Sequence, residues 1–298
     1  MWSWLKSLAP STVTSQPVEI PGASWSRLLS ALPFLAALAP AEQERLKLLT
    51  AHFLAGKEFH GAGGLVVTDD MALSIAAQAC LPLLHLRPPQ ARARAHVLDW
   101  YADFIGIVVH AGEVVARREA VDEATGVVHH YVEVLSGEAM HGGPVMLSWD
   151  EVARAADAAA EGTNVVVHEF VHKIVMQGYH GDGLPGDCPP LPDGFMGTAS
   201  PKDAVRAWFA ALVPVYENFR EQVIIAERFS GAPTWLDPYG AESLDEFFAV
   251  ACEAYFVNRR RFALEFAELL PVFDAFFRVD APAAAPPQTM ISKRGSSM

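Results

Sequence analysis

Apolar residues recur at helical spacing in the first third of the chain. Leucines mark one such helix face, at Leu28, Leu29, Leu32 and Leu35. This pattern predicts helical structure over about 25–59, with a second helix opening at Pro40. The stretch 71–80 is apolar almost all round and predicts a buried helix. We therefore expect a helical N-terminal region over residues 23–95, preceded by a flexible lead-in over 1–22 that is rich in Ser, Pro and Thr.

Short, β-branched and partly alternating segments replace the helical pattern after about Val97. They predict four strands, at 105–109, 113–117, 127–134 and 144–149. Further helices are predicted over 150–160, 165–174, 202–228 and 243–277. This order of elements predicts an α+β fold whose second part, residues 96–280, combines a small sheet with helices. The Ala- and Pro-rich segment 281–298 predicts a disordered tail.

The apolar run Val165–Ile174 contains His168-Glu169-Phe170-Val171-His172, the pattern H-E-x-x-H. Residues four apart lie on the same helix face, so His168 and His172 can offer two imidazole nitrogens to a single metal ion. Glu169 is placed to act as the general base toward a water molecule at that metal. The opposing interpretation is a chance match, with two hydrogen-bonded core histidines and a surface glutamate. Two histidines within an otherwise apolar helix are costly unless they are ligated or paired, which favours the metal site.

A second apolar helix, predicted to follow Ser243, carries Glu246 and Glu253 on nearly the same face. A carboxylate buried among phenylalanines requires a charge partner, and a zinc ion is a suitable one. Either glutamate can complete a site of two histidines and one glutamate that leaves a fourth position for water. The alternative for Glu253 is an ion pair with a neighbouring arginine, at Arg259, Arg260 or Arg261.

Composition and charge narrow the class of protein. Hydrophobic residues make up 51% of the chain and charged residues 19%, as in a folded globular protein. The net charge of −13 argues against direct binding to nucleic acid or to anionic membranes. No signal peptide is recognisable, and the longest largely apolar run, 71–86, is short for a membrane span. Three widely spaced cysteines (Cys80, Cys188 and Cys252) fit a reducing compartment, so we expect a cytoplasmic protein.

Five segments of the chain share a family pattern. They are Glu42-Gln43 with Arg45-Leu46, Phe53-Leu54 with Lys57, Phe59 and Gly61, Ile75 to Leu83, Val167 to Lys173, and Asp245 to Val250. On these segments the chain, over roughly residues 25–280, resembles the Mlc titration factor A family, zinc metallopeptidases distantly related to the catalytic domain of anthrax lethal factor. The resemblance implies a zincin-like metallopeptidase domain with a small mixed sheet. It also selects His168, His172 and Glu246, rather than Glu253, as the zinc ligands.

The resemblance implies roles for further residues as well. The family's motif glutamate matches Glu169, the general base, and Tyr239 matches a tyrosine that stabilises the tetrahedral oxyanion. The alternative for Tyr239 is a structural role in the turn Asp237-Pro238-Tyr239-Gly240. The expected activity is aminopeptidase-like cleavage of small peptides, whereas the motifs themselves leave internal cleavage equally open.

The helix of the H-E-x-x-H pattern departs from the family at one position. Family members usually continue the motif with H-K-L-D, whereas this chain has Val175 where that acid stands. An acid there can orient a ligand histidine, and a valine cannot. The sequence offers three substitutes for this acid as the partner of a ligand histidine, namely Asp182, Asp187 or a backbone carbonyl.

A second hypothesis is a regulatory binding protein. The resembled family is named for titrating a transcriptional repressor of sugar-uptake genes, which requires a surface rather than catalysis, and the N-terminal helices are the natural candidate for it. A fourth protein ligand such as His180 would close the metal site and leave it structural. We expect the long loop 178–197 to lie beside the site. His141 and His180 are the histidines best placed to line the cleft. We also expect a sheet edge that can bind an extended peptide as one more strand.

Overall fold

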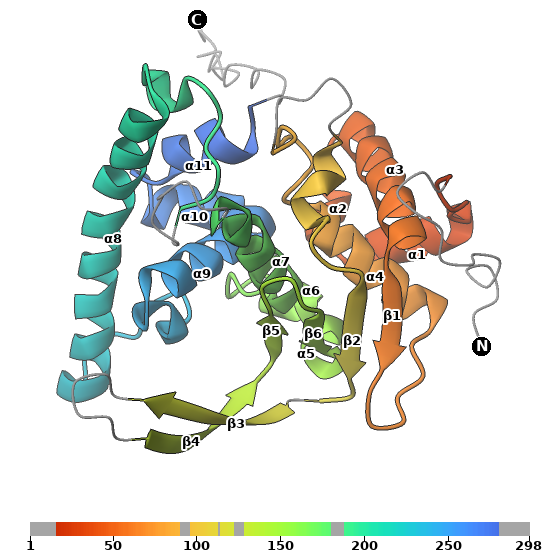
Figure 1. Ribbon diagram of the computed structural model, residues 1–298, viewed down its shortest axis with the longest axis horizontal. Helices are drawn as coiled ribbons and strands as arrows, with labels where there is room; N and C mark the ends of the chain where they lie inside the picture. The colour runs from red at the N-terminus through yellow and green to blue at the C-terminus, as the bar shows by residue number, and fades with distance from the viewer. Residues whose placement is uncertain (1–15, 90–95, 113, 122–127, 180–187, 280–298) are drawn as a thin grey trace, which may run out of the picture.

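The N-terminal part of the chain is helical, in agreement with its leucine spacing (Figure 1). The computed structural model describes residues 16–89, 96–112, 114–121, 128–179 and 188–279. Its first helices are α1 (Gly22–Ala31), α2 (Pro33–Ala36), α3 (Pro40–Gly56) and α4 (Asp69–Cys80). Thr68 caps α4, because its side chain accepts a hydrogen bond from the backbone N–H of Met71 at 3.2 Å. The expected lead-in lies largely outside the described residues.

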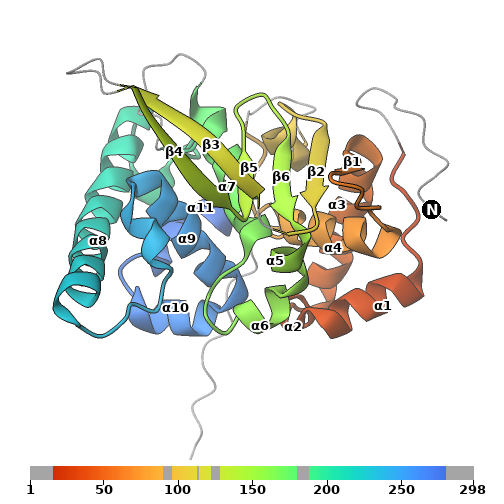
Figure 2. The same cartoon turned by 90° about the horizontal axis from the view of Figure 1, so that it is seen from below.

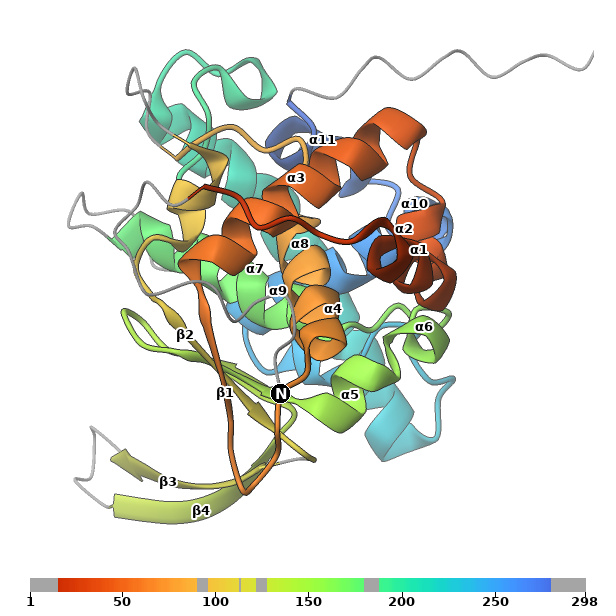
Figure 3. The same ribbon diagram turned by 90° about the vertical axis from the view of Figure 1, so that its right-hand side faces the viewer.

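Four short strands form a mixed sheet in the order β1-β2-β6-β5. They are β1 (Glu58–Gly61), β2 (Gly106–His110), β6 (Val145–Ser148) and β5 (Gly137–Ala139). β1, β2 and β6 run parallel, whereas β5 pairs antiparallel with β6 and forms an edge. Along β2, Ile107 and Val109 are buried while their neighbours are half-buried, so one face of the sheet is covered. Figure 3 shows the helices gathered on that side.

A two-stranded antiparallel ribbon stands apart from this sheet. β3 (Val114–Val121) pairs with β4 (Val128–Leu135) over eight residue pairs, and Figure 2 shows the ribbon beside the sheet. Two short helices follow β6, namely α5 (Trp149–Ala153) and α6 (Ala155–Ala158). The chain then enters α7 (Val165–Met176), which carries the H-E-x-x-H pattern at the centre of the molecule.

The C-terminal part is helical again. A single-turn 3₁₀ helix η4 (Pro238–Ala241) lies between the long α8 (Pro201–Phe229) and the central α9 (Leu244–Val257). α10 (Arg259–Glu265) and α11 (Leu270–Phe277) complete the described chain. Three further 3₁₀ segments occur, at η1 (Val97–Tyr101), η2 (Gln177–Tyr179) and η3 (Phe195–Gly197). The predicted tail 281–298 lies outside the described residues.

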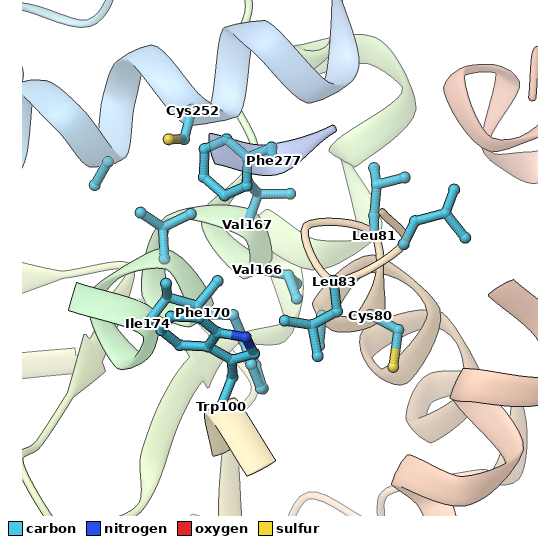
Figure 4. Close-up of a cluster of buried hydrophobic side chains, with 14 of the residues drawn as sticks. Cys80, Leu81, Leu83, Trp100, Val166, Val167, Phe170, Ile174, Cys252 and Phe277 are labelled. Atoms are coloured by element: carbon cyan, nitrogen blue, oxygen red, sulfur yellow. The ribbon is translucent and has the colours of Figure 1, made fainter. Parts of the chain in front are cut away.

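One hydrophobic core joins the N-terminal helices to α7 and α9. Figure 4 shows Cys80 of α4, Phe170 of α7, Cys252 of α9 and Phe277 of α11 within one cluster. The ring of Phe170 lies 5.6 Å from that of Phe53 in α3. Because packed aromatic rings resist displacement, α7 is held in a fixed position between the two helical regions.

The observed elements agree with an α+β fold containing a small mixed sheet. Eleven α-helices occur among the described residues. Two observed strands are not among the predicted ones. β1 begins inside the predicted helical stretch 25–59, and β5 lies between the strands predicted at 127–134 and 144–149. Within the described part of the chain, none of the helices combines the length and apolarity needed to cross a membrane.

Candidate metal centre

α7 and α9 pack against each other and bring three ligand-type side chains together. The Nε2 atoms of His168 and His172 are 3.1 Å apart. Glu246 Oε2 lies 3.0 Å from His168 Nε2 and 3.3 Å from His172 Nε2. Two imidazole nitrogens and one carboxylate oxygen thus form a nearly equilateral triangle.

This triangle has the dimensions of one face of a zinc coordination tetrahedron. With zinc–ligand bonds of about 2.0–2.1 Å, tetrahedral ligand atoms are about 3.3–3.4 Å apart. The donor set of two histidines and one carboxylate is also the one that zinc accepts in hydrolytic sites, with a fourth position left open. The residues present therefore fit a zinc ion.

The opposite nitrogen of each histidine faces a second carboxylate. His168 Nδ1 lies 2.8 Å from Glu253 Oε1, and His172 Nδ1 lies 3.2 Å from Asp245 Oδ2. An Nδ1–H donated to a carboxylate fixes the ring orientation and leaves Nε2 as the lone-pair donor. With a metal bound, these contacts would hold both rings in the tautomer that presents Nε2 to the triangle.

The electrostatics of the pocket favour a positive charge between these groups. Burial lowers the pKa of His168, but hydrogen bonds with the carboxylates of Glu246 and Glu253 outweigh it and hold that pKa well above its usual range. Burial likewise opposes protonation of His172, while Asp245 and Glu246 raise the pKa of this residue to about 9. Burial raises the pKa of Glu246, but its two histidine partners hold it below the usual range. The carboxylates that stabilise imidazolium here would equally stabilise a bound cation.

Glu169 is a buried carboxylate next to His168 in α7. Its side chain is almost completely buried, and burial raises its pKa to about 7. It lines the same cavity as His168 and His172. A carboxylate with a pKa near neutrality can both accept and return a proton at neutral pH.

Tyr239 lies at the rim of the site, in η4. Its ring centroid is 6.1 Å from that of His168, and the residue is 37% exposed. Asp237 caps this turn by accepting a hydrogen bond from the backbone N–H of Tyr239 at 2.9 Å. The cap holds Tyr239 beside the histidine pair.

A cavity of about 600 Å³ opens over the three ligand-type residues. The edge strand β5 forms one wall, with Gly137, Glu138 and Ala139 among the lining residues. α5, α6 and the start of α7 contribute a further wall, and η4 and α9 contribute the last. An extended ligand in this space would lie along a sheet edge.

Glu246 and Glu253, which the residues alone left as alternative ligands, make different contacts in the structure. Glu246 faces the Nε2 atoms, whereas Glu253 hydrogen-bonds His168 from behind. The alternative ion pair of Glu253 is not formed, since Arg259 pairs with Asp274 and Arg261 with Glu265.

Val175, which stands where the family usually has an acid, is buried, and Asp245 and Glu253 orient the histidines instead. Sequence analysis missed the role of Asp245, although its position directly before Glu246 was a usable signal. The proposed substitutes Asp182 and Asp187, and the fourth-ligand candidate His180, lie outside the described residues. His141 is exposed and is not among the described residues that line the cavity.

The chain matches the glucose-regulated metallo-peptidase M90 family over residues 4–278. Mlc titration factor A from Klebsiella pneumoniae is 30% identical over 257 residues, which cover 86% of each chain. The protein of the same name from Serratia proteamaculans is 30% identical over 267 residues, which cover 90% of this chain and 91% of that one. The resemblance found in the sequence is thereby confirmed, and the chain belongs to the glucose-regulated metallo-peptidase M90 family.

Proposed function

We propose that this chain is a zinc-dependent peptidase with a zincin-like catalytic domain, in which His168, His172 and Glu246 hold the metal. The observation that carries the proposal is the triangle of three ligand atoms, 3.0–3.3 Å apart, beside the buried Glu169. When bound, zinc would supply a Lewis acid that polarises a peptide carbonyl and acidifies a water molecule.

Glu169 acts in this proposal as the general base and then as the general acid. Its buried carboxylate takes a proton from the attacking water and passes it to the leaving amine. The phenol of Tyr239 donates a hydrogen bond to the oxyanion that forms on the former carbonyl oxygen. Its partial exposure at the cavity rim is compatible with contact to a substrate.

The peptide is proposed to bind in extended form along β5. An edge strand can take up an extended peptide as one further strand of its sheet. β5 is such an edge and lies directly against the cavity, whereas the strand predicted at 144–149 is the inner β6. We expect aminopeptidase-like cleavage of small peptides, as the family resemblance implies.

The test is zinc content by elemental analysis together with cleavage of a fluorogenic aminoacyl anilide. We expect about one zinc per chain in the wild type, with cleavage that a chelator abolishes. Glu246→Ala should lose the metal, whereas Glu169→Gln should keep it and lose at least about a hundredfold in kcat. A wild-type protein without zinc, or a Glu169→Gln variant of normal activity, would overturn the proposal.

A second candidate function is binding to a transcriptional repressor. What favours it is the name of the relatives, Mlc titration factor A, which describes titration of a partner protein. Binding requires no proton transfer, so Glu169→Gln should retain it. Loss of repressor capture in this variant would contradict an independent binding role.

A further inference from the structure

A buried line of polar side chains leads from His168 back to the N-terminal helices. His168 Nδ1 lies 2.8 Å from Glu253 Oε1, and Glu253 Oε2 accepts a hydrogen bond from the backbone N–H of Asn164. The side-chain amide of Asn164 then donates to Gln78 Oε1 at 2.7 Å. Gln78 belongs to α4, far from the H-E-x-x-H pattern in the sequence.

Each amide in this line has one orientation that satisfies all of its partners. Asn164 Oδ1 accepts from the backbone N–H of Val167 at 2.9 Å, so its Nδ2 must point to Gln78. Gln78 Nε2 donates to the backbone oxygen and the hydroxyl of Ser74, so its Oε1 is the atom left to accept from Asn164. The hydrogen-bonding capacities of the two amides therefore determine the direction of the whole line.

Because these side chains are buried, the loss of one of their hydrogen bonds costs more free energy than it would at the surface. Gln78 is fully buried, Asn164 is 3% exposed and Glu253 is 5% exposed. A buried polar group that loses its partner bears its full desolvation cost, whereas a surface group turns to water. Removing the Gln78 acceptor would leave the Asn164 amide without a partner and free Asn164, and with it Glu253, to shift.

We propose that Gln78 and Asn164 are positioning residues for the metal centre, and that helix α4 thereby takes part in orienting His168. The inference rests on the proposed zinc site. Glu253 can hold the His168 ring only while its other oxygen is anchored by Asn164, and Asn164 is itself anchored by Gln78. The N-terminal helices thus contribute to metal affinity without supplying a ligand.

The test is the zinc affinity of Gln78→Leu, measured by competition with a chromogenic chelator, together with the visible absorption of the cobalt-substituted protein. Leucine is close to glutamine in size and removes only the polar end. Loss of the group that hydrogen-bonds a ligand histidine costs metal sites about 10- to 100-fold in affinity. Gln78 acts two links further out, through Asn164 and Glu253. We therefore expect weakening of about tenfold or less and a changed cobalt spectrum, because the imidazole of His168 is no longer fixed.

Two companion variants separate positioning from general destabilisation. Asn164→Ser keeps a capping oxygen for α7 and the backbone N–H to Glu253 but severs the link to Gln78, so it should weaken zinc binding as Gln78→Leu does. Ile75→Val lies on the same buried helix outside the polar line and should leave zinc affinity unchanged. Wild-type affinity and cobalt spectrum in both Gln78→Leu and Asn164→Ser would overturn the inference while leaving the zinc site standing. A wild type that binds no zinc would instead overturn the proposed function.

Discussion

The carboxylate of Glu169 lies against the backbone of Gly137 in the edge strand β5. A Cβ added at Gly137 would be 2.5 Å from Glu169 Oε1 and 2.7 Å from its Cγ. We therefore expect Gly137→Ala to displace Glu169, the proposed general base, while leaving the three proposed metal ligands in place. Because a misplacement of about 1 Å can cost a hundredfold in rate, kcat should fall by about 10- to 100-fold. Steady-state kinetics with zinc content measured in parallel tests this.

The matched control is Gly106→Ala in strand β2 of the same sheet. A Cβ there would meet only Pro144 Cβ, at an ordinary contact distance of 3.7 Å. This variant should keep wild-type kcat. Equal activity of Gly137→Ala and Gly106→Ala would show that Glu169 does not need the space beside Gly137.

Lys57 gives the folded protein a specific pH dependence of stability. Burial lowers its pKa to about 7, from an ordinary value of 10.5. Between these two pH values the unfolded chain binds a proton that the folded chain does not, so the free energy of unfolding rises with pH. One such proton contributes a slope of up to about 1.4 kcal/mol per pH unit.

Lys57→Met should remove this slope, although it also removes the hydrogen bonds of Lys57 to the carbonyls of Tyr101 and Phe104. Urea unfolding of both proteins at about pH 7.5 and about pH 9.5 measures it. The wild type should gain stability over the variant as the pH rises, since titrating groups that do not interact with Lys57 cancel in the comparison. Parallel pH profiles would contradict a lowered pKa in the folded state.

At this scale the motif was sufficient to place the two histidines on one helix face with Glu169 beside them, whereas Glu246 was selected over Glu253 only by the family resemblance. His168, His172 and Glu169 share one motif, and their relative positions follow from helix geometry alone. Assigning Asp245 and Glu253 to the outer nitrogens required knowing how α9 crosses α7, which no local pattern encodes. The contact of Gln78 with Asn164 was even less predictable, because the pattern of an apolar helix predicts burial but not the partner of its one amide side chain.

Among the elements, the long helix α8 ends in a strained conformation. Ser230, its C-cap, has φ 55° and ψ 36°, the left-handed region that residues with a Cβ avoid. Ser230→Gly should therefore raise the free energy of unfolding by about 1 kcal/mol. Urea unfolding tests it, with Ser230→Ala as the control that keeps the Cβ and should show no such gain.

The two strands that the sequence pattern failed to predict are short. β1 and β5 have four and three residues, and β5 reads Gly-Glu-Ala without a β-branched or aromatic side chain. Such strands form because a neighbouring strand supplies hydrogen bonds, a tertiary effect that propensity does not capture. Helices such as α7, α8 and α9 were predictable because their apolar or amphipathic periodicity extends over several turns.

Over the whole molecule, negative charge is concentrated at the cavity. Eight carboxylate residues line it, namely Glu138, Glu151, Glu161, Glu169, Asp237, Asp245, Glu246 and Glu253. Neither lysine nor arginine occurs among the described residues of its wall. The eight carboxylates outnumber the two histidines of the wall, and such an excess of negative charge raises the local concentration of positively charged ligands.

We therefore expect kcat/KM to be higher for a lysyl anilide than for the similarly shaped, uncharged norleucyl anilide. Salt screens such attraction, so the ratio of the two values should fall as ionic strength rises from about 0.05 to about 0.5 M. Measuring kcat/KM for both substrates across this range tests for electrostatic attraction, because an effect of salt on the chemical step changes both values alike and leaves their ratio unchanged. A ratio that does not change with salt would contradict electrostatic selection.

The order of the helices along the chain also determines when each part of the metal site becomes available during protein synthesis. α3 and α4 precede α7 along the chain, so the residues that cover its apolar side are already synthesised when α7 emerges from the ribosome. Glu246 and both orienting carboxylates follow only with α9. A growing chain thus presents two histidines without the third ligand, an incomplete set that holds zinc weakly. We expect the nascent protein to be inert toward its neighbours on the ribosome, with hydrolytic capacity arising only once translation has passed α9.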